Sequence, residues 1–479
     1  MNKDNELFEI ENGVLTKVKN KNIKEAVIPK GVTEIGKEAF RDCKSLTNVI
    51  IPEGVTEIKK EAFNGCSNLK SITIPNSTTK IGSNAFSYCE SLTNVIIPEG
   101  VTEIEKEAFN GCSNLKSITI PNSVTKIGKS AFSYCESLTN VIIPEGVTEI
   151  NEYSFYQCKN LEKVVLSEGL EKIRYGAFFE CDSLKSINIP KSVKKIGSCA
   201  FRECNSLESA VIPKGTKIDV GAFVNCSPSF SFYTPAGEKT ERKINRIKNG
   251  VFLGTIKDVS EISIPEGVTE IGLDAFRDYK FLKKVILPES VSVIGEYAFA
   301  SSTLEEITIP KGIKKIEFCA FFESKSLTNV IIPEGVTKIG KFAFQHCTSL
   351  TNVILPKTIT EIESFAFTCC SSLQNIVIPE GVTRIGECAF DNCTSLTNVI
   401  ISESVTRIGW CAFMHCDSLT NVIIPKSVTE IVKGAFEDCK SLTNVTIPKD
   451  LKFTENPFIG CTSLKSLTTH EGEEIPLPN

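Results

Sequence analysis

One arrangement of apolar and polar residues recurs along nearly the whole chain. Its clearest copy, from Cys43 to Phe63, reads Cys-Lys-Ser-Leu-Thr-Asn-Val-Ile-Ile-Pro-Glu-Gly-Val-Thr-Glu-Ile-Lys-Lys-Glu-Ala-Phe. Because a unit of this length cannot bury its apolar face alone, the repetition predicts a solenoid of stacked coils. Each copy ends in a phenylalanine, here called the anchor, and successive anchors are 23 or occasionally 22 residues apart, except across one gap after Phe223. The anchors are Phe40, Phe63, Phe86, Phe109, Phe132, Phe155, Phe178, Phe201, Phe223, Phe276, Phe299, Phe321, Phe344, Phe367, Phe390, Phe413, Phe436 and Phe458.

The first half of each unit predicts a short β-strand. Val49 and Ile51 are two residues apart, so both side chains are expected to face the interior of the solenoid. Pro52 cannot donate a ladder hydrogen bond, and Gly54 follows it at the spacing of a tight turn. The strand is therefore expected to end at Pro52.

The second half of the unit predicts a shorter extended segment, marked by Val55 and Ile58. Ala62, Phe63 and Cys66 then fall at helical spacing, which predicts a single helical turn. Each coil is therefore expected to hold two short strands and one helical turn around an apolar interior.

These residues resemble the BspA-type leucine-rich repeat family. The resemblance rests on Ile-Pro at the end of the strand, Val-Thr-x-Ile-Gly after it and Ala-Phe-x-x-Cys at the end of the unit. It implies an α/β-type leucine-rich repeat solenoid, a right-handed superhelix of about 18 coils with a concave parallel β-sheet. It also implies a non-catalytic scaffold for protein interaction or adhesion, often a surface antigen of bacteria or protozoa.

The repeats form two arrays with separate starts. Asn12-Gly13 lies between two short extended runs, which is typical of a β-hairpin, and Asn249-Gly250 repeats this pattern before the second array. A hairpin at the start would cover the first coil, whose apolar interior would otherwise face water. We expect an N-terminal hairpin cap at 1–22, a first array at 23–235, a basic connector with a second cap-like start at 236–258, a second array at 259–467 and a frayed tail at 468–479.

Composition and charge exclude several kinds of function. A net charge of −5 and a pI near 5.7 give no reason to expect a nucleic acid or an anionic membrane as partner. No phosphate-binding glycine loop or nucleophile motif appears, so we expect neither an enzyme nor a cofactor. Residues 1–12 lack the apolar core of a signal peptide, and no stretch is long enough to span a membrane. We therefore expect a cytoplasmic protein, with the cell surface or secretion as the alternative that the resemblance favours.

The basic connector allows two interpretations. It is either a patch that binds an acidic partner or a solvated connecting helix or loop, and we favour the second because charge runs are usually solvated. Its basic residues are Lys239, Arg242, Lys243, Arg246 and Lys248.

The 20 cysteines do not read as a disulfide framework. Fifteen of them occupy one position, three residues after an anchor phenylalanine. Cysteines stacked in register would point in parallel, with their Cβ atoms about one strand spacing, ~4.8 Å, apart, which is wider than the ~3.8 Å typical of a disulfide. We expect reduced, buried thiols that pack as small apolar side chains.

The best candidates for a metal site are His346, Cys369 and His415, each two residues after an anchor. Asp42 and Gly65 occupy the same position in other coils, which indicates a permissive surface column. His346 and His415 stand three coils apart, roughly 14 Å at one strand spacing per coil, too far to share a metal ion. We therefore expect no metal site.

The outward face of the strands is the predicted binding surface. Two rows of residues flank the inward-facing strand position in the second array, and together they form an apolar stripe beside an amide ladder. A protein is the expected partner; a glycan is less favoured because these rows lack aromatic residues, and a structural spacer remains the alternative without a ligand. The candidate residues are Asn329, Ile331, Asn352, Ile354, Asn375, Val377, Asn398, Ile400, Asn421 and Ile423.

Limited proteolysis tests the boundary between the arrays. We expect the first cut between Pro235 and Lys257, because the repeat pattern is lost there and the chain is polar. A first cut inside a repeat, identified by mass spectrometry of the fragments, would contradict the division into two arrays.

Overall fold

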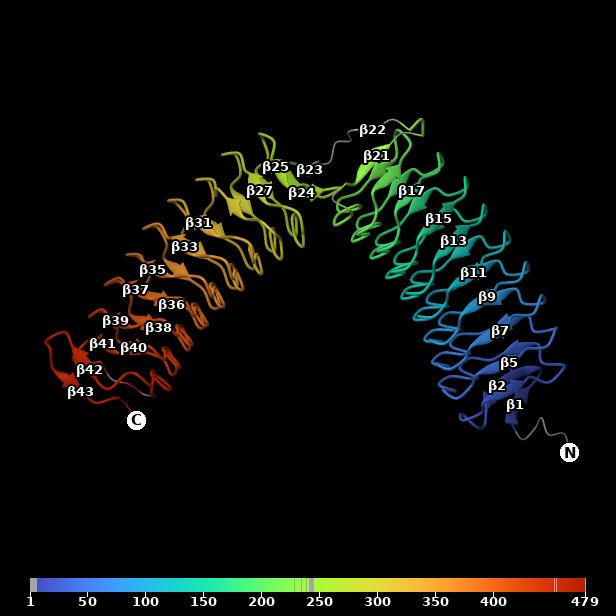
Figure 1. The fold of residues 1–479 in the computed structure, drawn as a ribbon, viewed down its shortest axis with the longest axis horizontal. Helices are drawn as coiled ribbons and strands as arrows, with labels where there is room; N and C mark the ends of the chain where they lie inside the picture. The colour runs from blue at the N-terminus through green and yellow to red at the C-terminus, as the bar shows by residue number, and fades with distance from the viewer. Residues whose placement is uncertain are drawn as a thin grey trace. The chain divides into compact units, whose positions relative to one another are not determined.

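Most repeats fold into one coil that contributes a strand to each of two parallel stacks of strands, here called the first and the second sheet, as Figure 1 shows. Among the described residues, hydrogen bonding divides these stacks into eight sheets. The computed structural model describes residues 7–227, 229–233, 235–237, 239–240, 245–451, 453 and 455–478. It holds about 19 turns of solenoid, close to the number predicted. The chain divides into two units, residues 1–244 (unit 1) and 245–479 (unit 2).

The first sheet contains the predicted Asn-Val-Ile strands, which pair in parallel with a register of one coil. In unit 1 its strands are β3 (Glu25–Val27), β5 (Asn48–Ile50), β7 (Ser71–Thr73), β9 (Asn94–Ile96), β11 (Ser117–Thr119), β13 (Asn140–Ile143), β15 (Lys163–Leu166), β17 (Ser186–Asn188), β19 (Ser209–Val211) and β21 (Ser231–Tyr233). In unit 2 they are β25 (Glu261–Ser263), β27 (Lys284–Ile286), β29 (Glu306–Ile307), β31 (Asn329–Ile331), β33 (Asn352–Ile354), β35 (Asn375–Ile378), β37 (Asn398–Ile401), β39 (Asn421–Ile423) and β41 (Asn444–Ile447).

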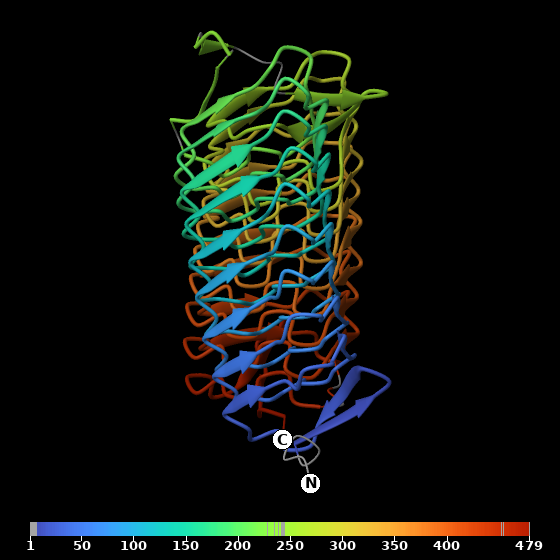
Figure 2. The same cartoon turned by 90° about the vertical axis from the view of Figure 1, so that its right-hand side faces the viewer.

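The second sheet confirms the predicted second extended segment. Figure 2 shows the strands of unit 1 stacked in two columns, one for each sheet. The second-sheet strands of unit 1 are β4 (Glu34–Ile35), β6 (Glu57–Ile58), β8 (Lys80–Ile81), β10 (Glu103–Ile104), β12 (Lys126–Ile127), β14 (Glu149–Ile150), β16 (Lys172–Ile173), β18 (Lys195–Ile196) and β20 (Lys217–Ile218). Those of unit 2 are β26 (Glu270–Ile271), β28 (Val293–Ile294), β30 (Lys315–Ile316), β32 (Lys338–Ile339), β34 (Glu361–Ile362), β36 (Arg384–Ile385), β38 (Arg407–Ile408) and β40 (Glu430–Ile431).

The interior is a column of stacked rings. Successive anchor phenylalanines within each unit have ring centroids 4.8 to 5.6 Å apart and lie nearly parallel. Around them Val49 and Ile51 and most of their equivalents are buried, as predicted, whereas Leu166, Leu287 and Leu355 are half-buried. Each ring fills the space between its two neighbours, so the core is continuous along the unit.

Antiparallel hairpins cover the first coil of each unit. In unit 1, β1 (Phe8–Glu11) and β2 (Val14–Val18) form a hairpin, and β2 continues the second sheet by pairing in parallel with β4. Phe8 is buried with its ring 6.1 Å from that of Phe40. In unit 2, β23 (Asn245–Lys248) and β24 (Val251–Thr255) repeat this arrangement, and Phe252 stacks on Phe276 at 5.0 Å.

The last coils are also covered by pairing strands. In unit 1, β22 (Lys239–Thr240) runs antiparallel to β21. In unit 2, β42 (Leu467–Thr469) extends the first sheet and pairs antiparallel with β43 (Glu474–Ile475), so the expectation of a frayed tail is wrong. The basic residues Lys239, Arg246 and Lys248 lie in β22 and β23, neither a helix nor a loop, and Arg242 and Lys243 lie outside the described residues.

The segment around each anchor phenylalanine differs from the prediction. Among the described residues the structure has no helix, so the predicted helical turn per coil is wrong. Glu38 and Asp42, on either side of Phe40, have φ of 59° and 58°, and such left-handed residues interrupt an α-helix. The amide of Phe40 donates to the carbonyl of Ala62 in the next coil at 2.7 Å, whereas an α-helix would bond it within its own turn.

Left-handed residues recur two positions before and two positions after the anchors. His346, Cys369 and His415 belong to the second of these columns, with φ of 60°, 61° and 56°. The sequence indicated a permissive surface column, but these positions also require a positive φ, which was not predicted. The signal was present, because Gly65 and Asp42, of types that tolerate this conformation, occupy the same column.

The thiols of the main cysteine column donate hydrogen bonds to the core backbone. Cys112 Sγ donates to the carbonyl of Phe86 at 3.2 Å, and thirteen further cysteines in this column make the same contact. Ser324 replaces cysteine in one coil and donates to the carbonyl of Phe299 at 2.8 Å. Burial raises the pKa of the Cys112 thiol to about 12. The column therefore supplies a buried donor as well as apolar volume.

Replacing Cys112 tests the contribution of the thiol donor. We expect Cys112→Ser to be more stable than Cys112→Ala by about 1 kcal/mol, because serine keeps the hydrogen bond to the Phe86 carbonyl and alanine does not. Urea unfolding of the two variants measures the difference. An alanine variant as stable as the serine variant would mean that the thiol acts only by filling space.

Replacing His346 tests the backbone constraint. We expect His346→Gly to be at least as stable as the parent and His346→Val to lose roughly 1–2 kcal/mol, because a β-branched residue is strained at positive φ. At the adjacent Gln345, which lacks positive φ, the glycine variant should instead be destabilised. Thermal unfolding of the three variants checks this order, and equal effects of glycine at the two positions would contradict it.

Candidate functional site on the strand face

The first sheet of unit 2 exposes two rows that were predicted from the sequence. The aliphatic row (Ile331, Ile354, Val377, Ile400 and Ile423) is 50 to 64% exposed. The amide row (Asn329, Asn352, Asn375, Asn398 and Asn421) is exposed as well, and Asn444 extends it by one strand. The residue between the two rows on each strand is buried, so the alternation of inward and outward residues is confirmed.

Parallel pairing aligns the members of each row. Asn329 pairs with Asn352 and Ile331 with Ile354 in the ladder between β31 and β33. Strands β31, β33, β35 and β37 belong to one hydrogen-bonded sheet, and β39 and β41 begin the next. The rows thus cross one boundary between hydrogen-bonded ladders, which the sequence did not predict.

A third outward row, not predicted from the sequence, accepts hydrogen bonds from some of the amides. It is called the hydroxyl row because five of its six members are threonine, and all six are exposed: Thr328, Thr351, Gln374, Thr397, Thr420 and Thr443. Thr351 Oγ1 donates to the carbonyl of Thr328 in the preceding coil at 3.1 Å. Asn329 Nδ2 and Asn421 Nδ2 donate to the threonine hydroxyls beside them at 3.2 and 3.0 Å. The recurrent Thr-Asn pair in the sequence was the signal for this network.

The three rows from β31 to β41 contain no ionisable residue. Such a surface is unusual for a chain in which 23% of residues are charged. The neighbouring strands β27 and β29 carry Lys283, Lys284, Glu305 and Glu306 outward, paired across the coils at 3.0 and 2.5 Å. The charge-free surface therefore begins sharply at β31.

The strand face of unit 1 has neither a continuous aliphatic row nor a charge-free surface. Its aliphatic positions alternate with threonine, as at Ile50, Thr73 and Ile96. Lys70 and Lys116 stand where unit 2 has threonine. Unit 1 thus has exposed isoleucines without the continuous uncharged surface.

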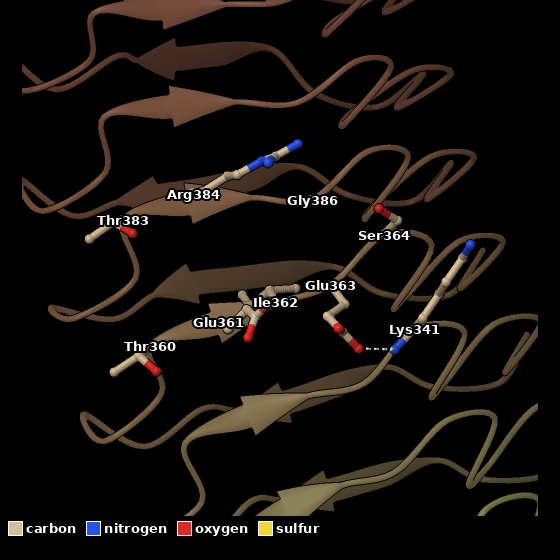
Figure 3. A pocket seen from close by; sticks show the side chains of 9 residues that line it. All are labelled: Lys341, Thr360, Glu361, Ile362, Glu363, Ser364, Thr383, Arg384 and Gly386. Atoms are coloured by element: carbon tan, nitrogen blue, oxygen red, sulfur yellow. Dashed lines mark hydrogen bonds between the residues drawn. The ribbon is translucent and has the colours of Figure 1, made fainter.

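A hollow on the second sheet of unit 2 is a different kind of surface. Figure 3 shows Glu363 accepting a hydrogen bond from the backbone amide of Lys341, at 2.8 Å. Lys338 bonds to Glu363 and Glu361 at 2.7 and 2.9 Å, and these hydrogen bonds raise the pKa of the Lys338 ammonium. The charged side chains at this hollow are therefore paired with one another between successive coils.

Additional aromatic residues of unit 2 contact one another beside the anchor column. Tyr297, Phe318, Phe342 and Phe365 have successive ring centroids 5.4, 5.7 and 5.1 Å apart, and Lys341 lies over Phe342 at 4.9 Å. The ring faces are partly covered by neighbouring rings and by the lysine. These rings therefore pack against one another locally.

The side chains of His346, Cys369 and His415 lie in one column and do not come together at one site. Within the described residues, no group of three or more His, Cys, Asp or Glu side chains is placed to hold a metal ion. His415 Nδ1 lies 3.6 Å from a carboxylate oxygen of Asp438 in the next coil. Among the described elements there is also no helix with the length and apolar character required to cross a bilayer.

Comparison with known proteins identifies the repeat. The model of the BspA type leucine rich repeat region matches residues 16–139, 125–244, 245–370 and 360–475. No curated protein matches the chain. A leucine rich cell surface protein from Faecalibacterium prausnitzii is 29% identical, with a TM-score of 0.50, over 82% of this chain and 92% of that one.

Two further solved structures are similar to this chain in sequence. A leucine-rich repeat protein from Bacteroides ovatus is 26% identical over 96% of this chain and 91% of its own, with a TM-score of 0.32. The leucine-rich repeat protein of T. pallidum is 31% identical over 37% of this chain and 88% of its own, with a TM-score of 0.35. With family matches that span both units, the chain belongs to the BspA-type leucine-rich repeat family.

Proposed function

We propose that the protein is a non-catalytic interaction scaffold that binds a protein partner through the strand face of unit 2. The observation that carries the proposal is the aliphatic row, exposed on five successive strands within a surface free of charge. Contiguous exposed apolar surface of this kind marks interaction sites, and the centre of an interface is depleted in charged residues. Four strand spacings make the row about 19 Å long.

Membership of a repeat family of scaffolds supports this proposal. A solenoid presents an extended surface on which each coil adds one set of outward residues. Asparagine amides both donate and accept hydrogen bonds, so the amide row suits a polar border around an apolar contact. The outward rows hold no aromatic residue, which favours a protein over a glycan.

The location proposed for this binding is the cell surface. The support is the similarity to the F. prausnitzii protein, which is described as a cell surface protein. We thus propose the cell surface, the alternative that the family resemblance favoured, instead of the cytoplasmic location expected from the sequence. Adhesion to another cell or to a host protein is consistent with a scaffold of this type.

A double substitution tests the proposed face. We expect Ile354→Lys with Ile400→Lys to reduce partner capture at least about tenfold, because two charges would enter an apolar contact. The thermal midpoint should change little, because both side chains face solvent. Quantitative pull-down from extracts of the source cells measures the capture.

The matched control is Ile96→Lys with Ile142→Lys on the strand face of unit 1, where both side chains are at least as exposed. This variant should keep its partner. Unfolding of the unit 2 variant would show that the row is buried core, and unchanged capture would exclude this face as the site.

A further inference from the structure

The aliphatic row of unit 2 has borders of different chemistry on its two sides. One border is the amide row. The other is the turn that follows each strand, where the position three residues beyond the aliphatic residue is charged. We call the first four of these residues the turn rim: Glu334, Lys357, Glu380 and Glu403, all of them exposed.

The turn rim presents an open negative charge. Within the part of the chain that the structure describes, none of its four residues forms an ion pair. The next two residues of the same column, Lys426 and Lys449, are already paired with Glu471 and Glu473 of the C-terminal hairpin, at 3.5 and 2.8 Å. Three carboxylates and one ammonium therefore remain available beside the aliphatic row.

Charge complementarity indicates which kind of partner surface would fit the strand face of unit 2. A partner needs an apolar strip to cover the aliphatic row, basic residues on the flank above the turn rim, and uncharged polar residues on the flank above the amide row. A surface with an apolar strip between two polar flanks is amphipathic. Two regular conformations can present it, a helix laid across the strands and an extended chain.

The spacing of the coils separates these two conformations. Successive coils present an aliphatic side chain about every 4.8 Å. Along one face of an α-helix, apolar residues that recur every 3.5 positions on average are about 5.2 Å apart, so over four spacings the mismatch is only about 2 Å. Side chains on one face of an extended chain are about 6.7 Å apart, so the mismatch with the coils grows to about 8 Å over the same four spacings.

We propose that the strand face of unit 2 binds an amphipathic α-helix with a basic flank, its apolar residues on the aliphatic row and its Lys or Arg residues above Glu380 and Glu403. About 13 helical residues would cover the row. This inference rests on the proposed function, since it names the kind of segment that the same face binds. An apolar helix face laid on an apolar surface is an established mode of peptide recognition.

Synthetic peptides of about 18 residues, five helical turns, test the proposal without knowledge of the natural partner. The first carries Leu at i, i+3, i+4 and i+7, Lys along one flank and Gln elsewhere. The second has Glu in place of each Lys. The third has the composition of the first, reordered so that Leu and polar residues alternate. We expect the full chain to bind the first peptide at least about tenfold more tightly than either of the others, measured by fluorescence anisotropy.

Variants of the chain test whether the aliphatic row and the turn rim each contribute to binding. Ile354→Lys with Ile400→Lys should abolish binding of the basic helical peptide, whereas Ile96→Lys in unit 1 should leave it unchanged. Glu380→Lys with Glu403→Lys should reverse the preference in favour of the acidic peptide. Equal binding of the alternating peptide, or a preference that survives charge reversal, would overturn the inference.

Failure of the inference and failure of the proposed function are distinguishable. If the isoleucine variant loses its natural partner but the parent chain shows no preference for the basic helical peptide, the face binds a protein by another segment and the helix is excluded. If the isoleucine variant keeps its natural partner, the proposed function itself is excluded.

Discussion

Every coil of this protein depends on the next coil for contacts that it cannot make within its own 23 residues. The ring of each anchor phenylalanine lies between two others, and backbone amides such as that of Phe40 donate to a carbonyl one coil further on. The thiol of Cys112 reaches back to a carbonyl of an earlier coil. A shift of one residue in any coil would break all three contacts together, so the register of the stack is the constraint from which the rest follows.

This register also turns a repeated sequence into rows on the surface. An outward residue that recurs once per coil becomes a line of identical side chains about 4.8 Å apart. From β31 onward in unit 2 the lines are mainly threonine, asparagine and an aliphatic residue, while in unit 1 lysine and threonine interrupt them. The difference between the two arrays is therefore a difference of surface chemistry on a shared core.

The strands could be predicted from the sequence, and the turn segment could not. Val49 and Ile51 are buried on either side of the exposed Ile50, an alternation typical of an extended chain, and the exposed rows follow directly from it. Ala62, Phe63 and Cys66 have a spacing that fits a helix and a string of tight turns equally well. What decides between them is the bonding of alternate amides to the next coil, a long-range effect that apolar periodicity does not report. The charge-free surface of unit 2 was visible in the sequence, but only a comparison of all outward positions shows it.

The buried thiols carry a consequence for where such a chain can operate. Disulfide exchange requires a thiolate, and burial raises the pKa of Cys43 to about 11 and that of Cys112 to about 12. Eighteen of the 20 cysteines are buried and therefore form this thiolate less readily, whereas Cys199 and Cys369 are partly exposed. Because most of the thiols lie in the core, their number does not by itself indicate an oxidising compartment.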